Sequence, residues 1–189
     1  SNDRFVFYGR ISLHDANSTT MRKPNRRSLR LKGYDYTSPG AYFVTLCTQG
    51  RLCLFGEIKE GVMCLNEIGH MIERWWLSIP ERFEHVDIDA FVIMPNHLHG
   101  IIVFEAIVNK QFRHVSLASV VRWFKTKTTN EYIQGVKQKG WPPFNRRLWQ
   151  RNYWEHIIRN DRSLERIRRY IVENPLRWHL DRENPIYWK

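Results

Sequence analysis

The chain has 189 residues, of which 42% are hydrophobic, and a formal net charge of +11. This length suffices for one well-buried domain and is short for two, and no run of residues resembles a membrane span or a secretory signal, so we expect a cytoplasmic protein. The three cysteines contain no Cys-x-x-Cys pair, which argues against a disulfide framework and against a cysteine-based zinc site.

The positive charge is concentrated in the C-terminal part of the chain. Residues 110–189 hold 18 Lys and Arg against 7 Asp and Glu, whereas residues 42–109 hold 4 against 9. The basic part also holds many large rings, among them Trp149, Tyr153 and Trp154, although any single ring is more often part of a core. Cations interleaved with rings are typical of surfaces that bind single-stranded or hairpin nucleic acid, so we expect a nucleic-acid partner and a nucleoid association.

The first 32 residues are polar and basic and have no apolar periodicity. Residues 1–32 are therefore predicted to form a loosely ordered arm, which could contact nucleic acid or be a solvated leader, and residues 33–189 a single domain. Residues rich in β-formers predict a strand over 41–48, and two apolar runs, 52–55 and 62–65, predict a short hairpin.

Asn66 can cap a helix whose apolar positions recur at i, i+3, i+4 and i+7 and which ends before Pro80. The remaining predicted elements are, in order, strands over 86–94 and 97–105, a helix beginning at Ser116, a strand over 148–158, and a helix that is capped by Asn160 or Asp161 and stops near Pro175. This order predicts an α+β fold, a mostly antiparallel sheet with helices packed on one face.

Two histidines, His97 and His99, stand one residue apart at the start of the predicted strand 97–105. Residues two apart in a strand point to the same face, so the two imidazoles would lie side by side while Leu98 turns into the core. Burying both rings without a shared partner would be costly, which favours a functional pair over two structural residues. The pair would form half of a metal site.

The last predicted helix places Tyr170 beside the cationic Arg166, Arg168 and Arg169, with Asn174 one turn later on the same face. Nearby guanidinium groups favour the phenolate and attract a phosphate, which would make Tyr170 a better nucleophile. Considered alone, however, the helix favours a more ordinary alternative, a partly buried tyrosine beside a solvated arginine face.

The two stretches together are more specific. His97-Leu98-His99, followed far downstream by Tyr170-Ile171-x-x-Asn174-Pro175, resembles the single-tyrosine HUH endonucleases, in particular the IS200-like transposases and the REP-associated tyrosine transposases. The resemblance covers roughly residues 30–178 and implies a ferredoxin-like fold, related to the RNA-recognition fold. Further matching stretches are Met94-Pro95-Asn96-His97, Gly33-Tyr34-Asp35-Tyr36 before residues 42–45, Leu148-Trp149-Gln150, and residues 153–159.

The resemblance implies a role for each matching position. His97 and His99 correspond to the histidine ligands of an Mg²⁺ or Mn²⁺ ion, and Tyr170 corresponds to the nucleophile. Asn174 corresponds to a third ligand or its support; better-known members of the family have glutamine there, so the shorter amide would need a water molecule or a helix shift to reach the metal. Imidazole ligands by themselves suit Mn²⁺ better than Mg²⁺.

The implied activity is metal-dependent cleavage and transfer of single-stranded DNA next to a hairpin, such as a repetitive extragenic palindrome or a transposon end, through a 5′-phosphotyrosine. Transposing relatives often act as homodimers and domesticated ones as monomers, so both states stay open. Glu155 and His156 are expected at the end of the sheet or against DNA rather than on the metal. The residues expected to contact DNA are Arg122, Lys125, Lys127, Arg146, Arg147, Arg166, Arg168 and Arg169.

Two other functions remain as alternatives. One is a catalytically silent protein that binds hairpin DNA for regulation; the presence of all the named site residues argues against it. The other is a zinc-dependent hydrolase built on His97 and His99, which lacks an obvious water-activating carboxylate in the same stretch.

Overall fold

The computed structural model describes residues 39–106 and 115–187. The predicted N-terminal arm, residues 1–32, lies outside the described residues, so its role stays a prediction. No helix of the described part is both long enough and apolar enough to cross a membrane.

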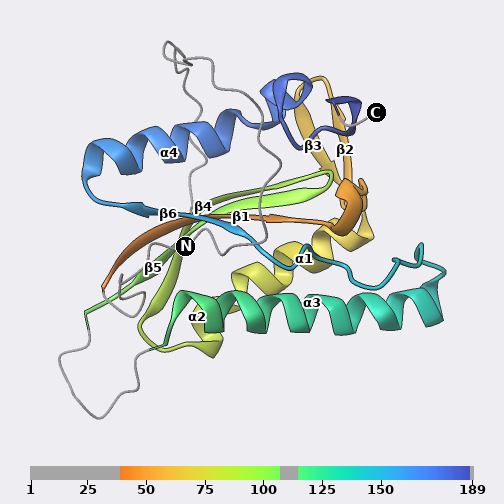
Figure 1. Ribbon diagram of the computed structural model, residues 1–189, viewed down its shortest axis with the longest axis horizontal. Helices are drawn as coiled ribbons and strands as arrows, with labels where there is room; N and C mark the ends of the chain where they lie inside the picture. The colour runs from red at the N-terminus through yellow and green to blue at the C-terminus, as the bar shows by residue number, and fades with distance from the viewer. Residues whose placement is uncertain (1–38, 107–114, 188–189) are drawn as a thin grey trace, which may run out of the picture.

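A four-stranded antiparallel sheet forms the centre of the molecule, with the strand order β4-β5-β1-β6 (Figure 1). Helix α1 and the short helix α2 lie between β1 and β4, and helix α3 lies between β5 and β6, which gives the ferredoxin-like order that the family resemblance implies. The fold class is therefore confirmed. The bounds are β1 (Gly40–Cys47), α1 (Glu67–Leu77), α2 (Ile79–Arg82), β4 (Val86–Met94), β5 (His97–Phe104), α3 (Leu117–Lys139) and β6 (Trp154–Ile158).

The long helices begin where the capping residues predict. Asn66 accepts a hydrogen bond from the Gly69 amide at the start of α1, and Ser116 accepts one from the Ser119 amide at the start of α3. Asn160 caps the last helix, α4 (Asp161–Glu173), in the same way. Each cap satisfies a backbone donor that the first helical turn would leave without a partner.

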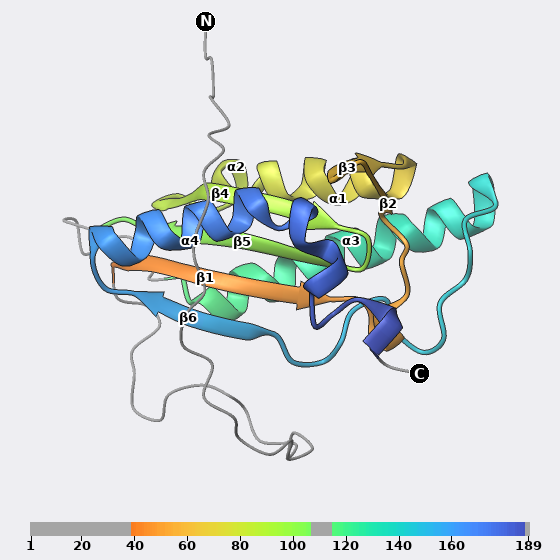
Figure 2. The same cartoon turned by 90° about the horizontal axis from the view of Figure 1, so that it is seen from above.

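Helices cover both faces of the sheet, which corrects the expectation that they pack on one. α1 and α3 cover the face where most of the buried apolar side chains lie, while α4 lies on the opposite face (Figures 1 and 2). There Ile167 and Ile171, one turn apart on α4, pack with Phe43, Ile101 and Ile158. This second apolar layer holds α4 over the strand that carries the histidine pair.

Two predicted strands have different bounds in the structure. The hairpin consists of β2 (Gly56–Lys59) and β3 (Val62–Leu65), so the first strand lies four residues beyond the predicted 52–55. Its two-residue turn explains the shift: Glu60 and Gly61 have positive φ angles of 51° and 78°, and such a turn pairs Lys59 directly with Val62.

The predicted strand over 148–158 is also shorter, since β6 begins at Trp154. Leu148 and Trp149 are instead buried, and the Trp149 indole donates a hydrogen bond of 2.9 Å to Thr128 of α3. Beyond α4 the chain continues as two 3₁₀ helices, η2 (Pro175–Leu180) and η3 (Pro185–Tyr187), and a third, η1 (Gln49–Arg51), follows β1.

Candidate metal and nucleophile site

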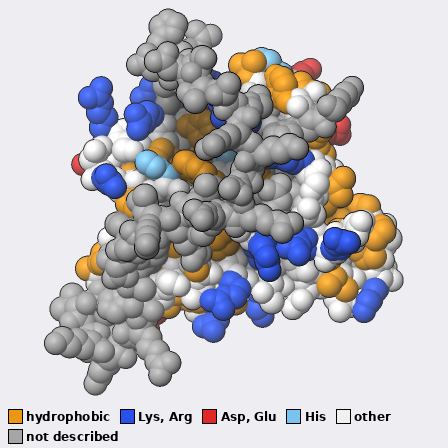
Figure 3. Space-filling model, viewed as in Figure 1, with side chains coloured by type: hydrophobic (Ala, Val, Ile, Leu, Met, Phe, Trp, Pro, Cys, Tyr) orange, Lys and Arg blue, Asp and Glu red, His pale blue; other side chains and the backbone are white. Residues whose placement is uncertain are grey.

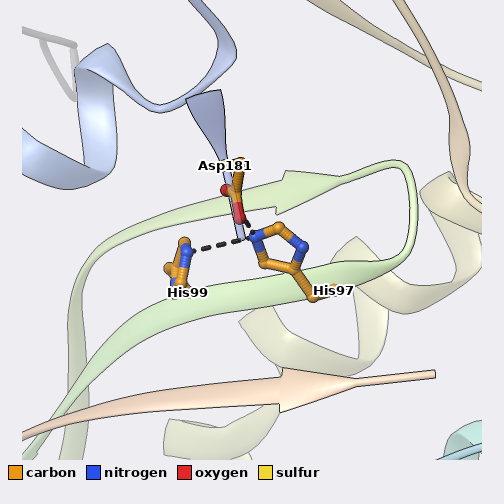
Figure 4. Close-up of side chains that lie close together, drawn as sticks. All are labelled: His97, His99 and Asp181. Carbon is orange, nitrogen blue, oxygen red and sulfur yellow. Dashed lines mark hydrogen bonds and ion pairs between the residues drawn. The ribbon is translucent and has the colours of Figure 1, made fainter. Parts of the chain in front are cut away.

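The two histidines lie side by side at the start of β5, as predicted. The hairpin between β4 and β5 turns at Pro95 and Asn96, and both imidazoles then point to the α4 side of the sheet (Figure 4). They are 0% and 4% exposed, and their Nε2 atoms are 3.1 Å apart. Leu98, between them, is fully buried on the other face.

The neighbours of His97 fix which of its ring nitrogens carries the proton. The Asn96 side-chain amide donates to the carbonyl oxygens of Arg51 and Glu183, at 3.0 Å and 2.7 Å, so its Oδ1 must be the atom that faces His97 Nδ1 at 2.9 Å. His97 Nδ1 therefore donates, and Nε2 presents a lone pair. Nδ1 of His99 lies 2.8 Å from the Thr45 hydroxyl, which orients the second ring.

A carboxylate that the sequence analysis missed completes this cluster. Asp181, just after η2, places its Oδ2 atom 3.5 Å from His97 Nε2 (Figure 4). One ligand atom each from His97, His99 and Asp181 lie within 4.8 Å of one another. Asp181 follows the helix at no periodic spacing from any predicted ligand, so the sequence carries little signal for it beyond its acidic character in a basic region.

The hydroxyl of Tyr170 lies beside the histidine pair in the same chain. Its oxygen is 3.4 Å from His99 Nε2, and the two ring centroids are 5.3 Å apart. The side chain is 40% exposed, so the tyrosine is open to a substrate on one side. The structure therefore brings together, within one chain, the two motifs that the sequence leaves about seventy residues apart.

The acidity of Tyr170 differs from the expectation. Burial raises the pKa of its hydroxyl above the usual value, and the charge of Asp181 raises it further, while a side-chain hydrogen bond with Asn174 and the charge of Arg177 lower it. The prediction that the neighbouring arginines would favour the phenolate is wrong. Burial is the largest cause of the shift, the arginine that lowers the pKa is Arg177, and Arg168 is paired with Asp89.

Asn174 is placed as the sequence predicts, one turn after Tyr170. Its side chain is 3% exposed, and its Oδ1 atom has no hydrogen-bond partner among the described residues. Oδ2 of Asp181 likewise accepts no hydrogen bond there. Both residues act on Tyr170, and their two buried acceptor oxygens are atoms that a bound cation would satisfy.

The electrostatics fit a divalent cation. Burial lowers the pKa of His97 well below its ordinary value, and burial lowers the pKa of His99 to about 3, so both rings are neutral at pH 7. Neutral imidazole nitrogens together with carboxylate and amide oxygens form a donor set that suits Mn²⁺ and related ions. These side chains present mostly hydrogen-bond acceptors and few donors, so they satisfy one another poorly. A bound cation would coordinate the acceptor atoms.

The basic residues expected to contact DNA separate into two groups (Figure 3). The first lines a groove of about 580 Å³ between α3 and residues 144–153, on the face of the sheet away from Tyr170. Its basic lining residues are Arg122, Lys125, Arg146, Arg147 and Arg151, the last of which was not predicted. Lys127 lies outside this groove, with its ammonium group 5.4 Å from the ring of Trp75.

Lys125 lies at the base of this groove and already has protein partners. Its ammonium group donates to the carbonyl of Gln150 at 2.9 Å and lies 5.4 Å from the ring of Tyr153. Burial lowers the pKa of Lys125 to about 8.

The second basic group is on α4, near Tyr170. Arg166 and Arg169 are exposed there, whereas Arg168 pairs with Asp89 of β4 through Nε at 2.8 Å and Nη2 at 2.6 Å. This two-pronged contact connects α4 to the sheet two residues before the tyrosine. Asp89 of β4 therefore helps to position α4.

The fold and this site define the class of the protein. A ferredoxin-like sheet with paired histidines on one strand and a tyrosine on the helix above them matches the single-tyrosine HUH class that the sequence resembles. The chain belongs to the IS200-like transposase family, whose model matches residues 66–174.

The chain is also similar to individual proteins. The chain is 42% identical over 175 residues to an uncharacterized protein of Haemophilus influenzae, covering 83% of this chain and 92% of that one. It is 25% identical over 153 residues to a protein of the same organism named as a REP-associated tyrosine transposase, covering 76% and 74% of the two chains. A solved REP-associated tyrosine transposase bound to a REP hairpin shares the fold, with a TM-score of 0.53, 20% identity, and coverage of 83% of this chain and 74% of that one.

Proposed function

We propose that this transposase-family protein is a metal-dependent endonuclease and strand transferase that acts on single-stranded DNA at hairpins. The observation that carries the proposal is the contact between the Tyr170 hydroxyl and His99, beside His97 and Asp181, within one chain. A nucleophile held against a cluster of metal-ligand side chains, and partly open to solvent, is the arrangement that phosphoryl transfer to a side chain requires.

The proposed reaction conserves the phosphodiester bond energy. The Tyr170 oxygen attacks phosphorus in line with the bond to the 3′-oxygen; the new bond joins the tyrosine to the 5′-phosphate, the old bond breaks, and a 3′-hydroxyl is released. The Tyr170 hydroxyl loses its proton as it attacks, helped by the hydrogen bond from Asn174 and the charge of Arg177, and the departing 3′-oxygen gains a proton, so the overall transfer neither consumes nor releases one. A second 3′-hydroxyl can reverse the attack, so that cleavage and joining are one chemistry run in two directions.

His97, His99 and Asp181 would hold the cation, and Asn174, which is hydrogen-bonded to Tyr170, would be a further oxygen donor. Mg²⁺ or Mn²⁺ would polarise the scissile phosphate and neutralise the charge that develops on the departing oxygen. Asn96 and Thr45 hold the two rings in the orientation that ligation needs.

The proposed DNA partner is a hairpin with a flanking single strand. A likeness in fold to a relative bound to a REP hairpin supports this class of substrate, and so does the net charge of +11. The basic groove beside α3 would contact phosphates of the duplex stem, while Arg166 and Arg169 on α4 would attract the strand to be cut. This substrate would place the protein at the nucleoid.

The test uses the purified full chain with end-labelled single-stranded DNA that contains hairpins from the region flanking its gene. With Mn²⁺ or Mg²⁺ present we expect a covalent protein–DNA adduct that survives denaturing electrophoresis and is lost with a chelator. Tyr170→Phe abolishes the adduct and leaves hairpin binding within about twofold, because the lost hydroxyl makes no contact with the stem. The matched control is Tyr187→Phe, which removes the hydroxyl of another exposed tyrosine, one that donates to the His179 carbonyl instead of lying beside the histidine pair.

Other results would select another function. Tight hairpin binding without any adduct under all metal conditions would indicate the catalytically silent regulator. Stoichiometric, tightly held zinc together with hydrolysis that is unchanged in Tyr170→Phe would indicate a zinc hydrolase, for which Asp181 now supplies the carboxylate that the sequence lacked nearby.

A further inference from the structure

Two exposed rings lie on the same face of the sheet as the nucleophile. Trp154 and His156 are two residues apart on β6, so both point to the α4 side. Their ring planes are nearly parallel, with an angle of 8° and a centroid distance of 5.9 Å. Trp154 is 46% exposed at the start of β6, which is an edge strand of the sheet, whereas Ile158 at the other end of β6 packs under α4.

The sheet register places Trp154 in line with the metal ligand. His99 of β5 pairs with Thr45 of β1, and Thr45 pairs with Trp154 of β6, so these residues form a row across three neighbouring strands. Adjacent strands are about 4.8 Å apart, which puts Trp154 roughly 10 Å from His99 along the sheet. Phe43 fills the space between, with its ring centroid 5.5 Å from that of Trp154 and 6.0 Å from that of Tyr170.

We propose that Trp154 and His156 form a stacking platform for a nucleobase of the single strand next to the phosphate that Tyr170 attacks. This inference rests on the proposed function and adds a binding subsite to it. The platform would hold the base flat against the indole while the strand's phosphate lies over the histidine pair. It would thereby orient the strand for in-line attack.

The chemistry of the surroundings favours a base of single-stranded DNA as the occupant. A large ring at an exposed sheet edge is more costly to leave in water than a small one, and an indole face accepts any base. Arg166 lies one turn before Tyr170 on the same face of α4 and is exposed, so a cation accompanies the rings. A surface for stacking and a cation that attracts phosphate therefore lie on the same face, as in other grooves that bind single-stranded DNA.

The neighbouring aromatic residues make the ring of Trp154 a poor candidate for core packing alone. Phe43 is 5% exposed and contacts His99, Tyr170 and Trp154 together, so it is the buried ring of this set. Trp154 and His156 lie outside it on the open edge. Removing the indole should therefore change ligand binding more than it changes folding.

The experiment uses the fluorescent base 2-aminopurine, placed at one position at a time in the single strand that flanks the hairpin. The full-length protein carries Tyr170→Phe so that the strand stays intact. We expect strong quenching at one position next to the scissile phosphate, because stacking on an indole quenches this base. Trp154→Ala should abolish the quenching and weaken single-strand binding by about 5- to 150-fold, the range for the loss of one stacked base.

Two variants provide the controls. Trp154→Phe keeps a ring and should keep most of the quenching and affinity, which also guards against a misfolded alanine variant. Leu77→Ala removes a side chain of similar exposure (42%) on α1, across the sheet, and should change nothing.

The outcomes separate the platform from the proposed function. Position-specific quenching that depends on Trp154 supports the platform even if the wild-type protein forms no covalent adduct. A covalent adduct with no position-specific quenching, or with quenching and affinity unchanged in Trp154→Ala, overturns the platform and leaves the proposed function standing. Quenching spread evenly along the strand also overturns it.

Discussion

The hydroxyl oxygen of Tyr170 lies 3.4 Å from Nε2 of His99, although the two residues are separated by most of the C-terminal half of the chain. The contact exists because α4 packs on the sheet face that the histidines also occupy. A single chain thus contains both parts of the site. Each part can therefore be altered separately by mutation.

The carboxylate of Asp181 is expected to be a metal ligand. Asp181→Asn keeps the shape and removes the charge, so the Mn²⁺ concentration for half-maximal binding should rise by about 10- to 100-fold, measured by calorimetry or by Mn²⁺ electron paramagnetic resonance. Asp87→Asn, an exposed change on β4, is the control. If Asn174→Ala weakens binding and Asp181→Asn does not, the third ligand is Asn174, as the family resemblance implies.

Asn96 should matter for folding and for metal binding together. Asn96→Ala removes the acceptor for His97 Nδ1 and the donors to two backbone carbonyls, so the free energy of unfolding should fall by about 1–3 kcal/mol in denaturant titration of the metal-free protein. Mn²⁺ affinity should fall as well, because the ring loses its fixed orientation. Asn152→Ala, at an exposed position, serves as control. Equal losses of stability and of Mn²⁺ affinity in the two variants would contradict the role of Asn96 in holding His97.

The pair formed by Arg168 and Asp89 should stabilise α4 in a way that depends on pH. The hydrogen bond with Arg168 lowers the pKa of Asp89 below its ordinary value of 3.8, so the unfolded chain takes up this proton first as the pH falls. The stabilisation is complete above pH 3.8 and is lost as the pH falls through the lowered pKa. Since both side chains are partly exposed, a double-mutant cycle with Arg168→Gln and Asp89→Asn should give a coupling of about 1 kcal/mol or less at pH 7.

The control for this cycle is Arg162→Gln, at an exposed position in the first turn of the same helix. Coupling that persists unchanged at pH 2.5 would show that the carboxylate is not its source. Because Arg168 lies two residues before Tyr170, we also expect Arg168→Gln to slow adduct formation with little change in hairpin affinity.

The groove beside α3 should contribute phosphate contacts that depend on salt. Arg122→Ala should weaken binding of a hairpin stem uniformly across sequences and reduce the slope of log affinity against log salt concentration by about 0.9. Lys127→Ala is a matched control on the same helix, because Lys127 lies against Trp75 outside the groove. Equal slopes for these two variants would remove the groove from the DNA-binding surface.

Local patterns were sufficient to predict most of the fold. The caps Asn66, Ser116 and Asn160 act over three residues, and the alternation around His97 and His99 is a property of one strand, so both are readable from neighbouring positions. The position of the hairpin of β2 and β3 could not be read in this way, because the turn at Glu60 and Gly61 sets its register. The face chosen by α4 depends on a second apolar layer formed by distant strands.

The candidate site likewise contains residues that local patterns predict and one residue that they do not. His97, His99, Tyr170 and Asn174 belong to local motifs, whereas Asp181 reaches the histidines only because the chain turns back after η2. The direction of the Tyr170 pKa shift was also predicted wrongly, because the sequence shows which arginines are neighbours but not that the tyrosine is buried. Distance in space and exposure to water are the two quantities that local patterns do not carry.

The position of Asp181 outside the family match has a consequence for how the site can evolve. The histidines, the tyrosine and Asn174 lie within residues 66–174, whereas the carboxylate comes from the chain that follows. A change in that following segment could exchange an anionic oxygen for a neutral one, or remove it, while the scaffold and the nucleophile stay as they are. In the proposed metal site, such a change would alter the choice of metal ion without changing the proposed nucleophile.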